Sequence, residues 1–185
     1  QGHDNEYETW RRRWMINYVR FMYQGGFRPH EARKIRFGNV EMDKRKDGKP
    51  VAIIQIDADT KTGRRETVMN GNTFLNVKSH LMKGIKIRNK QLDSMNAKLL
   101  KGNKVLDFHN RLHEKELPQV HNPEKDDFVL MNPFLNGKRR MYHDSHIRDW
   151  WNLILSECNF KNRYTLYSLR STHISYQLLQ GISVN

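Results

Sequence analysis

Three short segments of the sequence carry side chains that together could bind and activate a phosphate group. They are Gly-Phe-Arg-Pro-His-Glu-Ala at residues 26–32, Thr-Lys-Thr-Gly-Arg at residues 60–64 and Tyr-Ser-Leu-Arg-Ser-Thr at residues 167–172. A guanidinium holds two oxygens through a fixed fork of donors, so Arg28 and Arg170 could clamp the non-bridging oxygens of a phosphodiester under attack. Lys61 lies on a predicted turn between two strands and could protonate the departing oxygen.

In this order, and with a predicted helix ahead of the first and third segments, the three segments resemble the catalytic domain of the tyrosine recombinases, also called phage integrases. The resemblance covers nearly the whole chain. Arg28 and Glu31 match the Arg-x-x-Glu step of that family, and Lys61 matches its lysine on a hairpin turn followed by Thr-Gly. Arg170 and Thr172 match its His-x-Leu-Arg-His-Thr motif, which a glycine follows eleven residues after the arginine.

The resemblance implies a site-specific DNA recombinase, or integrase, which cleaves and rejoins DNA strands through a 3′-phosphotyrosyl intermediate without a metal ion or other cofactor. It assigns catalytic roles to Arg28, Lys61, Tyr167 and Arg170, and structural support of the site to Glu31. The expected partners are double-stranded DNA and, in the full-length protein, further copies of the chain in a homotetramer on paired DNA sites. The expected setting is a prophage or other mobile element in the bacterial cytoplasm, at the nucleoid.

Two positions depart from the family pattern. Tyr167 stands where the family most often has a histidine, and Ser171 stands where it has a second one. A phenol donates a hydrogen bond to a phosphate oxygen, but with an ordinary pKa of about 10 it accepts a proton poorly at neutral pH. The sequence therefore leaves an alternative open, which is a catalytically inactive DNA-binding module of the same fold.

The nucleophile of the family is a tyrosine that follows the third motif by some tens of residues. This sequence stops at residue 185, shortly after the matching glycine. We therefore expect residues 1–185 to form a single catalytic domain that lacks the N-terminal core-binding domain and the C-terminal segment with the nucleophile. Tyr176 lies where the family has no catalytic residue, so it does not take that role.

Hydrophobic periodicity predicts the elements that position these residues. It indicates an α+β domain that is mainly helical around a small three-stranded antiparallel sheet. Helices are expected at residues 8–23, 29–36 and 144–159, and from residue 168 to about 181, with strands at residues 37–42, 51–57 and 66–69. Residues 73–113 are lysine-rich and weakly periodic, and we expect helices there as well. A short extended run is expected at residues 128–131.

Caps and buried faces can also be predicted from residue types and spacing. Asp144 or Ser145 is expected to cap the helix at residues 144–159. Trp10 and Trp14 recur at helical spacing, which favours core positions over stacking on DNA bases. The helix at residues 144–159 is expected to bury Ile147, Trp150, Trp151, Ile154 and Leu155, and the last helix Leu169, Thr172, Tyr176 and Leu179.

The charge balance indicates a polyanionic partner. The 185 residues include 33 Lys and Arg against 20 Asp and Glu, a formal net charge of +13, and 37% of the residues are hydrophobic. These values fit one soluble domain whose cations release counterions from nucleic acid. A membrane surface gives no reason for the three motifs to occur in this order. Outside the catalytic set, the residues expected to contact DNA are Arg64, Arg65, Lys138, Arg139 and Arg140.

Other classes of protein are excluded or disfavoured. No apolar stretch approaches the roughly 18 residues that a membrane span requires, and the first eight residues lack the apolar core of a signal peptide. Cys158 is the single cysteine, which excludes an intramolecular disulfide. The paired histidines His109 with His113 and His143 with His146 lack neighbouring cysteines or a protease motif, so solvated helix faces are favoured over a metal site.

Overall fold

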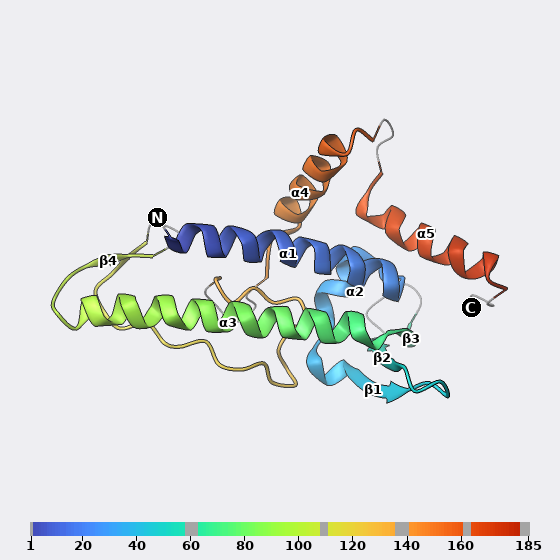
Figure 1. The fold of residues 1–185 in the computed structure, drawn as a ribbon, viewed down its shortest axis with the longest axis horizontal. Coiled ribbons are helices and arrows are strands. Elements are labelled where there is room, and N and C mark those ends of the chain that lie inside the picture. The colour runs from blue at the N-terminus through green and yellow to red at the C-terminus, as the bar shows by residue number, and fades with distance from the viewer. Residues whose placement is uncertain (1, 58–62, 108–110, 136–140, 161–163, 182–185) are drawn as a thin grey trace.

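The chain combines helices with small antiparallel sheets. The computed structural model describes residues 2–57, 63–107, 111–135, 141–160 and 164–181. Two long helices, α1 (Gly2–Gly25) and α3 (Gly71–Leu99), run antiparallel side by side, and a three-stranded sheet lies at one end of the pair (Figure 1). Helix α5 (Leu166–Leu179) packs against α1, with α4 (Asp144–Glu157) preceding it in the chain. The predicted mixture of helix and sheet is therefore confirmed.

Helix α1 covers the predicted segment at residues 8–23 and extends it at both ends. Its buried side chains recur at spacings of three and four residues, as one face of a helix requires. They are mostly large and aromatic, and they face α3 and the loops behind it. These residues are Tyr7, Trp10, Trp14, Met15, Tyr18, Phe21 and Met22.

Helix α3 replaces the several helices expected at residues 73–113. It runs without interruption for 29 residues, because Phe74, Val77 and Leu81 begin an apolar stripe that continues at helical spacing between the lysines. The sequence analysis missed the two-stranded sheet that follows, made of β4 (Val105–Leu106) and β5 (Leu112–His113). Two-residue strands carry no period that could be recognised.

The three-stranded sheet has the predicted antiparallel topology. Strands β1 (Val40–Lys44), β2 (Pro50–Ile56) and β3 (Arg65–Asn70) pair in the order β1-β2-β3. The first strand begins later than predicted, because Phe37–Asn39 forms a short 3-10 helix. Alternate residues of β2 are buried, as expected for a sheet with one face on the core.

The extended run predicted at residues 128–131 gives way to a turn after Phe128. The only bridge there joins Phe128 to Arg36, and the Met131 amide donates to the Phe128 carbonyl in a turn. Val129 and Leu130 are nonetheless buried. The apolar residues of this segment are buried in the core but do not form a strand ladder. Hydrophobicity alone does not distinguish such a buried turn from a short buried strand.

Helices α2 (Pro29–Lys34) and α4 begin where the sequence predicts, but the cap of α4 is different. His143 is the N-cap, and its Nδ1 accepts a hydrogen bond from the Ser145 amide. Neither Asp144 nor Ser145 has this role. Of the predicted buried face of α4, Ile147, Trp151 and Leu155 are buried, while Trp150 and Ile154 are partly buried against the same core.

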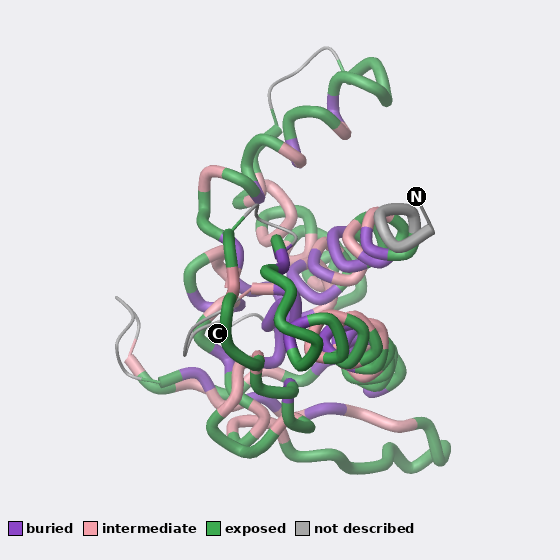
Figure 2. Tube along the Cα trace, turned by 90° about the vertical axis from the view of Figure 1, so that its left-hand side faces the viewer, coloured by how far each residue is buried: buried purple, intermediate pink, exposed green. Residues whose placement is uncertain are grey.

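The predicted buried face of α5 is largely wrong. No residue of α5 is fully buried, and Tyr176 and Leu179 are 54% and 83% exposed. Leu166 and Leu169 pack partly against the core instead. In Figure 2 the buried residues gather in the middle of the molecule, between the long helices and the sheet. None of the helices in the described part of the chain is long and apolar enough to cross a membrane.

Candidate functional site

The turn between α1 and α2 places Arg28 beside the first turn of α5, where Tyr167 lies. Gly26 has φ +59°, and a Cβ atom there would lie 2.6 Å from Cδ2 of His173 on α5. Glycine is therefore required both by the backbone conformation and by the close approach. Phe27 is fully buried and stacks on Phe21, which anchors the turn. The next residue, Arg28, is the N-cap position of α2.

Glu31 organises the cations around this turn. Its carboxylate accepts hydrogen bonds from the Arg28 amide at 2.8 Å, from Arg28 Nη1 at 2.7 Å and from Arg65 Nη2 at 2.7 Å. Its side chain is fully buried. Burial opposes ionisation, but the two hydrogen bonds from Arg28 and the charges of Arg65 and Arg28 outweigh it, so the pKa of Glu31 is lowered. Glu31 thus contacts Arg28 and Arg65 directly.

Arg170 reaches the same turn from α5. Its guanidinium donates a hydrogen bond to the Gly26 carbonyl, which is 144 residues earlier in the chain. Burial lowers the pKa of Arg170, and the neighbouring charges of Arg65 and Arg28 lower it further. Three guanidiniums therefore surround one carboxylate, which leaves an excess of positive charge at this place.

Tyr167 also belongs to this cluster. It lies one turn before Arg170 on α5, and 48% of it is exposed. A hydrogen bond between the Tyr167 side chain and the Arg28 guanidinium is the main influence that raises the pKa of Arg28. The phenol is therefore in position to orient Arg28.

Arg65 has a more central position than the sequence analysis gave it. It was expected only to contact DNA, yet it shares the buried Glu31 carboxylate with Arg28. Strand β3 brings it there, because Thr67 two residues later faces the same way and donates to the Gly25 carbonyl at 3.1 Å. Residues 31 and 65 are far apart in the chain, and no local spacing connects them.

The remaining predicted site residues are not brought into this cluster. Arg64 is exposed and donates to Gln55 Oε1 across the hairpin at 2.9 Å. Four others lie outside the described residues, so the structure neither places nor excludes them. These are Lys61, Lys138, Arg139 and Arg140.

The arrangement is suited to binding an oxyanion. The side chains of Arg28 and Arg65 are 16% and 25% exposed, so part of each side chain can be reached by solvent or a ligand. Charge-assisted hydrogen bonds from guanidiniums are the strongest available for phosphate oxygens. Glu31 fixes the two arginines in one place before any ligand arrives, which reduces the entropy lost on binding.

No metal site accompanies the cluster. Within the described ranges, no group of three histidine, cysteine, aspartate or glutamate side chains could hold a metal ion. His113 instead pairs with Asp107, which also binds Arg111 and thereby closes the β4–β5 hairpin. His143 caps α4.

Comparisons with known proteins identified no relative of this chain. A scan against protein-family models, a search of curated proteins and a search of solved structures each found no match.

Proposed function

We propose that this chain is the phosphate-binding part of a tyrosine-type site-specific DNA recombinase, with the catalytic-domain fold of that family. The recombinase breaks and rejoins DNA strands through a 3′-phosphotyrosyl intermediate. One observation carries the proposal. Arg28 and Arg170 come from motifs at opposite ends of the chain, and both lie at the turn that contains Gly26. Tyr167, from the same motif as Arg170, forms a hydrogen bond with Arg28.

Arg28 and Arg170 bind the non-bridging oxygens of the scissile phosphate. Attack by a nucleophile increases the negative charge on these oxygens, so donors that are already in place stabilise the transition state more than the ground state. Glu31 holds Arg28 through both its amide and its guanidinium. Arg65 shares that carboxylate and adds a further positive charge beside the phosphate.

The proton and the nucleophile come from elsewhere. Lys61, on the connection between β2 and β3, protonates the 5′ oxygen as it leaves. The attacking group is a tyrosine of the longer gene product, whose oxygen forms the bond to the 3′ phosphate and keeps it available for rejoining. Tyr176 does not have this role, because α5 carries it six residues after Arg170 on an exposed part of the helix.

Tyr167 replaces the histidine of the family by a phenol, which can donate or accept a hydrogen bond but accepts a proton poorly at neutral pH. Its contact with Arg28 supports a positioning role. The same replacement favours the alternative function, an inactive DNA-binding module, because a neutral phenol is a weak base. By resemblance, the full protein acts as a homotetramer on paired duplex sites in a bacterial cytoplasm.

The proposal is tested with the full-length gene product and a nicked suicide substrate that carries its attachment site. The wild type should form a covalent DNA adduct through a tyrosine. Arg28→Lys and Arg170→Lys keep the charge but lose the fork of donors, and each should slow adduct formation by about 100-fold or more. Arg45→Lys, in the exposed turn after β1, is the matched control and should react like the wild type.

Two outcomes would count against catalysis. A wild type that binds its site but never forms the adduct would leave the inactive module as the function. An adduct whose rate is unchanged by Arg28→Lys and Arg170→Lys would remove both arginines from the site, even if the protein were active.

A further inference from the structure

A polar groove follows one side of the contact between α1 and α3. Two hollows of about 390 and 240 Å³ are lined by the same stripe of each helix. The α1 stripe recurs at helical spacing over the distance from Glu6 to Gln24, which is about 27 Å at 1.5 Å per residue. The lining residues of α1 are Glu6, Thr9, Trp10, Arg13, Asn17, Arg20, Tyr23 and Gln24, and those of α3 are Thr73, Asn76, His80, Lys83 and Ile87.

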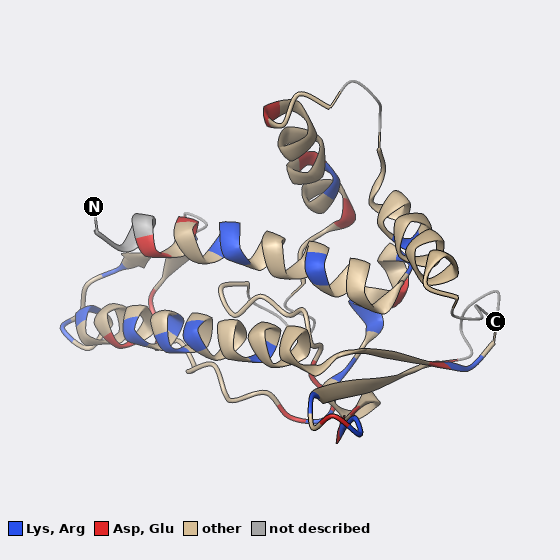
Figure 3. Cartoon of the chain, turned by 45° about the vertical axis from the view of Figure 1, so that its right-hand side comes forward, with Lys and Arg blue, Asp and Glu red and all other residues tan. Residues whose placement is uncertain are grey.

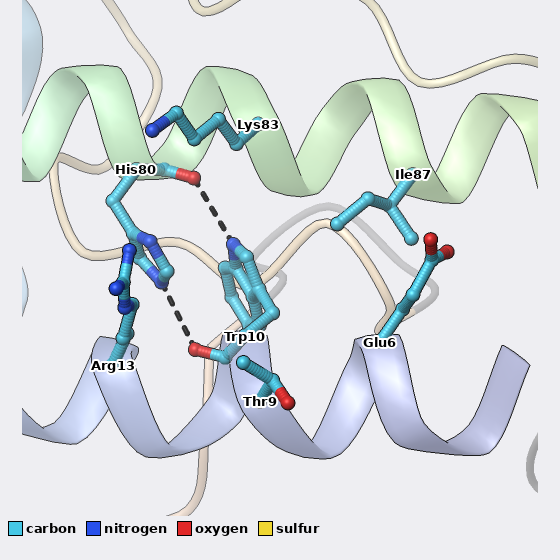
Figure 4. A pocket seen from close by; sticks show the side chains of 7 residues that line it. All are labelled: Glu6, Thr9, Trp10, Arg13, His80, Lys83 and Ile87. Atoms are coloured by element: carbon cyan, nitrogen blue, oxygen red, sulfur yellow. Dashed lines mark hydrogen bonds between the residues drawn. The ribbon is translucent and has the colours of Figure 1, made fainter.

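The floor of this groove is rigid. Trp10 Nε1 donates to the His80 carbonyl at 3.0 Å, and His80 Nε2 donates to the Trp10 carbonyl at 3.0 Å (Figure 4). The two rings are stacked with centroids 5.0 Å apart. These paired contacts hold α1 and α3 at a fixed separation, so the groove is formed before any ligand binds.

The groove carries positive charge on both helices. Arg13 and Lys83 come from opposite helices on either side of the His80 ring (Figure 4), and both charges lower the His80 pKa, after the larger effect of burial. Arg20 continues the row along α1. Among the residues that the structure describes, none forms an ion pair with these three cations.

Neutral hydrogen-bonding groups accompany the cations in the lining. They are Thr9, Asn17, Tyr23 and Gln24 of α1 and Thr73 and Asn76 of α3. The single acidic residue of the lining is Glu6, which lies beside Ile87 at the far end of the groove from Arg20 (Figure 4). A ligand with repeated negative charges is favoured along the row from Arg20 to Arg13 and is repelled beyond Arg13, where Glu6 lies.

The other end of the groove leads toward the candidate site. The Tyr23 ring lies edge-on to His173 of α5, with centroids 6.1 Å apart. His173 packs against Gly26, whose carbonyl binds Arg170. The residues that line this end of the groove include no carboxylate, so a strand that leaves the phosphate at Arg28 and Arg170 meets no acidic lining residue before it reaches Arg13.

We propose that this groove binds the sugar-phosphate backbone of duplex DNA outside the scissile phosphate; the inference rests on the proposed function. Arg13 and Arg20 are two helical turns apart, about 10 Å. Successive phosphates of one strand are separated by more than their rise of about 3.4 Å along the duplex axis, so the two arginines can bind different phosphates of the same strand. Three cations in such a row neutralise up to three phosphates. The amides and hydroxyls that accompany them accept any sequence, so the groove contributes affinity and register without reading bases.

The test is the salt dependence of duplex binding by the 185-residue chain, measured by fluorescence anisotropy. Arg13→Gln, Arg20→Gln and Lys83→Gln are combined in one variant. The control variant combines Arg12→Gln, Lys98→Gln and Lys101→Gln, which removes the same charge from exposed positions outside the groove. The groove variant should lower the slope of log affinity against log salt by about 3, and the control by less than about 1.

A second measurement uses the unaltered groove, so it does not depend on how well the variant folds. Duplex DNA placed between Arg13 and Lys83 should raise the pKa of His80, followed by NMR of its ring, because phosphate offsets the two positive charges. Polyglutamate of equal charge is the competitor. It should displace DNA poorly, since it lacks the phosphate spacing.

The outcomes separate this proposal from the recombinase function. Equal slopes for the two variants, no response of His80, or efficient displacement by polyglutamate would overturn the groove as a DNA site and leave the adduct test intact. A groove-dependent slope with a responding His80, in a protein that never forms the covalent adduct, would support the groove and overturn catalysis. A 185-residue chain that does not bind duplex DNA at all would overturn the groove, and the adduct test on the full-length product would then decide the recombinase function by itself.

Discussion

At the scale of single residues, the cluster of arginines depends on one buried acid. Arg28, Arg65 and Arg170 lie close enough to one another for their charges to lower the Arg170 pKa. Such repulsion opposes folding unless a negative charge offsets it. Glu31 supplies that charge through contacts with Arg28 and Arg65. Glu31 therefore holds two of the three cations in place.

Replacing Glu31 should be costly. Glu31→Ala leaves two guanidiniums without their shared partner, and breaking a buried ion pair in this way lowers the free energy of unfolding by about 3 kcal/mol. Glu66→Ala removes an exposed acid from the adjacent position on β3 and should change stability by less than about 0.5 kcal/mol. Urea denaturation measures both. Similar values for the two variants would show that the Glu31 contacts contribute little.

The lowered pKa of Glu31 predicts that the stability of the fold depends on pH. The pKa of Glu31 is lower in the folded chain than in the unfolded one. Its ionised form therefore stabilises the fold at pH values above the unfolded pKa of about 4.3, and this contribution is lost as pH falls through the lower folded value. Glu31→Gln should make the urea midpoint less sensitive to acid below about pH 4.3 than it is in the wild type. Parallel curves for the two proteins would contradict this.

At the scale of elements, the contact between α1 and α3 requires a small residue. A Cβ atom at Gly84 would overlap the Trp10 indole at Nε1 and lie 3.0 Å from Pro133. The helices therefore approach closely at the point where Trp10 and His80 exchange hydrogen bonds. The glycine lowers the helix propensity of α3, and the close packing offsets that loss.

Gly84→Ala tests this contact against helix propensity. In an exposed helix, alanine is more stable than glycine by about 1 kcal/mol. At Gly84 we expect the opposite sign, a loss of about 1 to 3 kcal/mol, because the added methyl group overpacks the helix contact. Ser94→Ala, at an exposed position of the same helix, is the control and should be neutral or slightly stabilising. A stabilised Gly84→Ala would show that α1 separates from α3 at little cost.

The elements also show where sequence patterns succeed. Helices α1, α2 and α4 and the three-stranded sheet were predictable, because apolar stripes and alternating strands have a period, whereas α3 was expected as several helices. The extended run at residues 128–131 and the buried face of α5 were predicted less well for one reason. The sequence shows that Val129 and Leu179 are apolar. Whether distant parts of the chain pair with the backbone at Val129 or cover the side chain of Leu179 cannot be read from that.

At the scale of the whole molecule, α5 is the helix least protected by the rest of the fold. It contributes Arg170 and Tyr167 to the site, yet none of its residues is fully buried. Helices α1 and α3, by contrast, share a continuous buried stripe. Local opening is easiest where few apolar contacts must be broken.

Hydrogen exchange should reveal this difference. In mass spectrometry, amides of α5 should exchange before those in the central turns of α1 and α3, with α4 in between because Ile147, Trp151 and Leu155 are buried. Bound duplex DNA should slow exchange in α5 if Arg170 binds phosphate. Equal protection of α5 and α1 in the free chain would contradict the prediction.

The net charge of +13 acts over the whole surface as well as at the site. Figure 3 shows that Lys and Arg recur along α1 and along the C-terminal half of α3. Such a distribution attracts polyanions from a distance and raises their association rate. The arginines of the candidate site are a small fraction of the 33 Lys and Arg residues that produce this electrostatic field.

The sequence by itself determined which residue types are available and which elements carry them. Arg28, Glu31, Tyr167 and Arg170 could be selected from motifs, because each motif is local and each element has a period. The tertiary structure decided which of them meet. It placed Arg65 on Glu31 and Arg170 on the Gly26 carbonyl, 34 and 144 residues away. Contacts at such separations depend on how helices and strands pack, and no spacing along the chain encodes that packing.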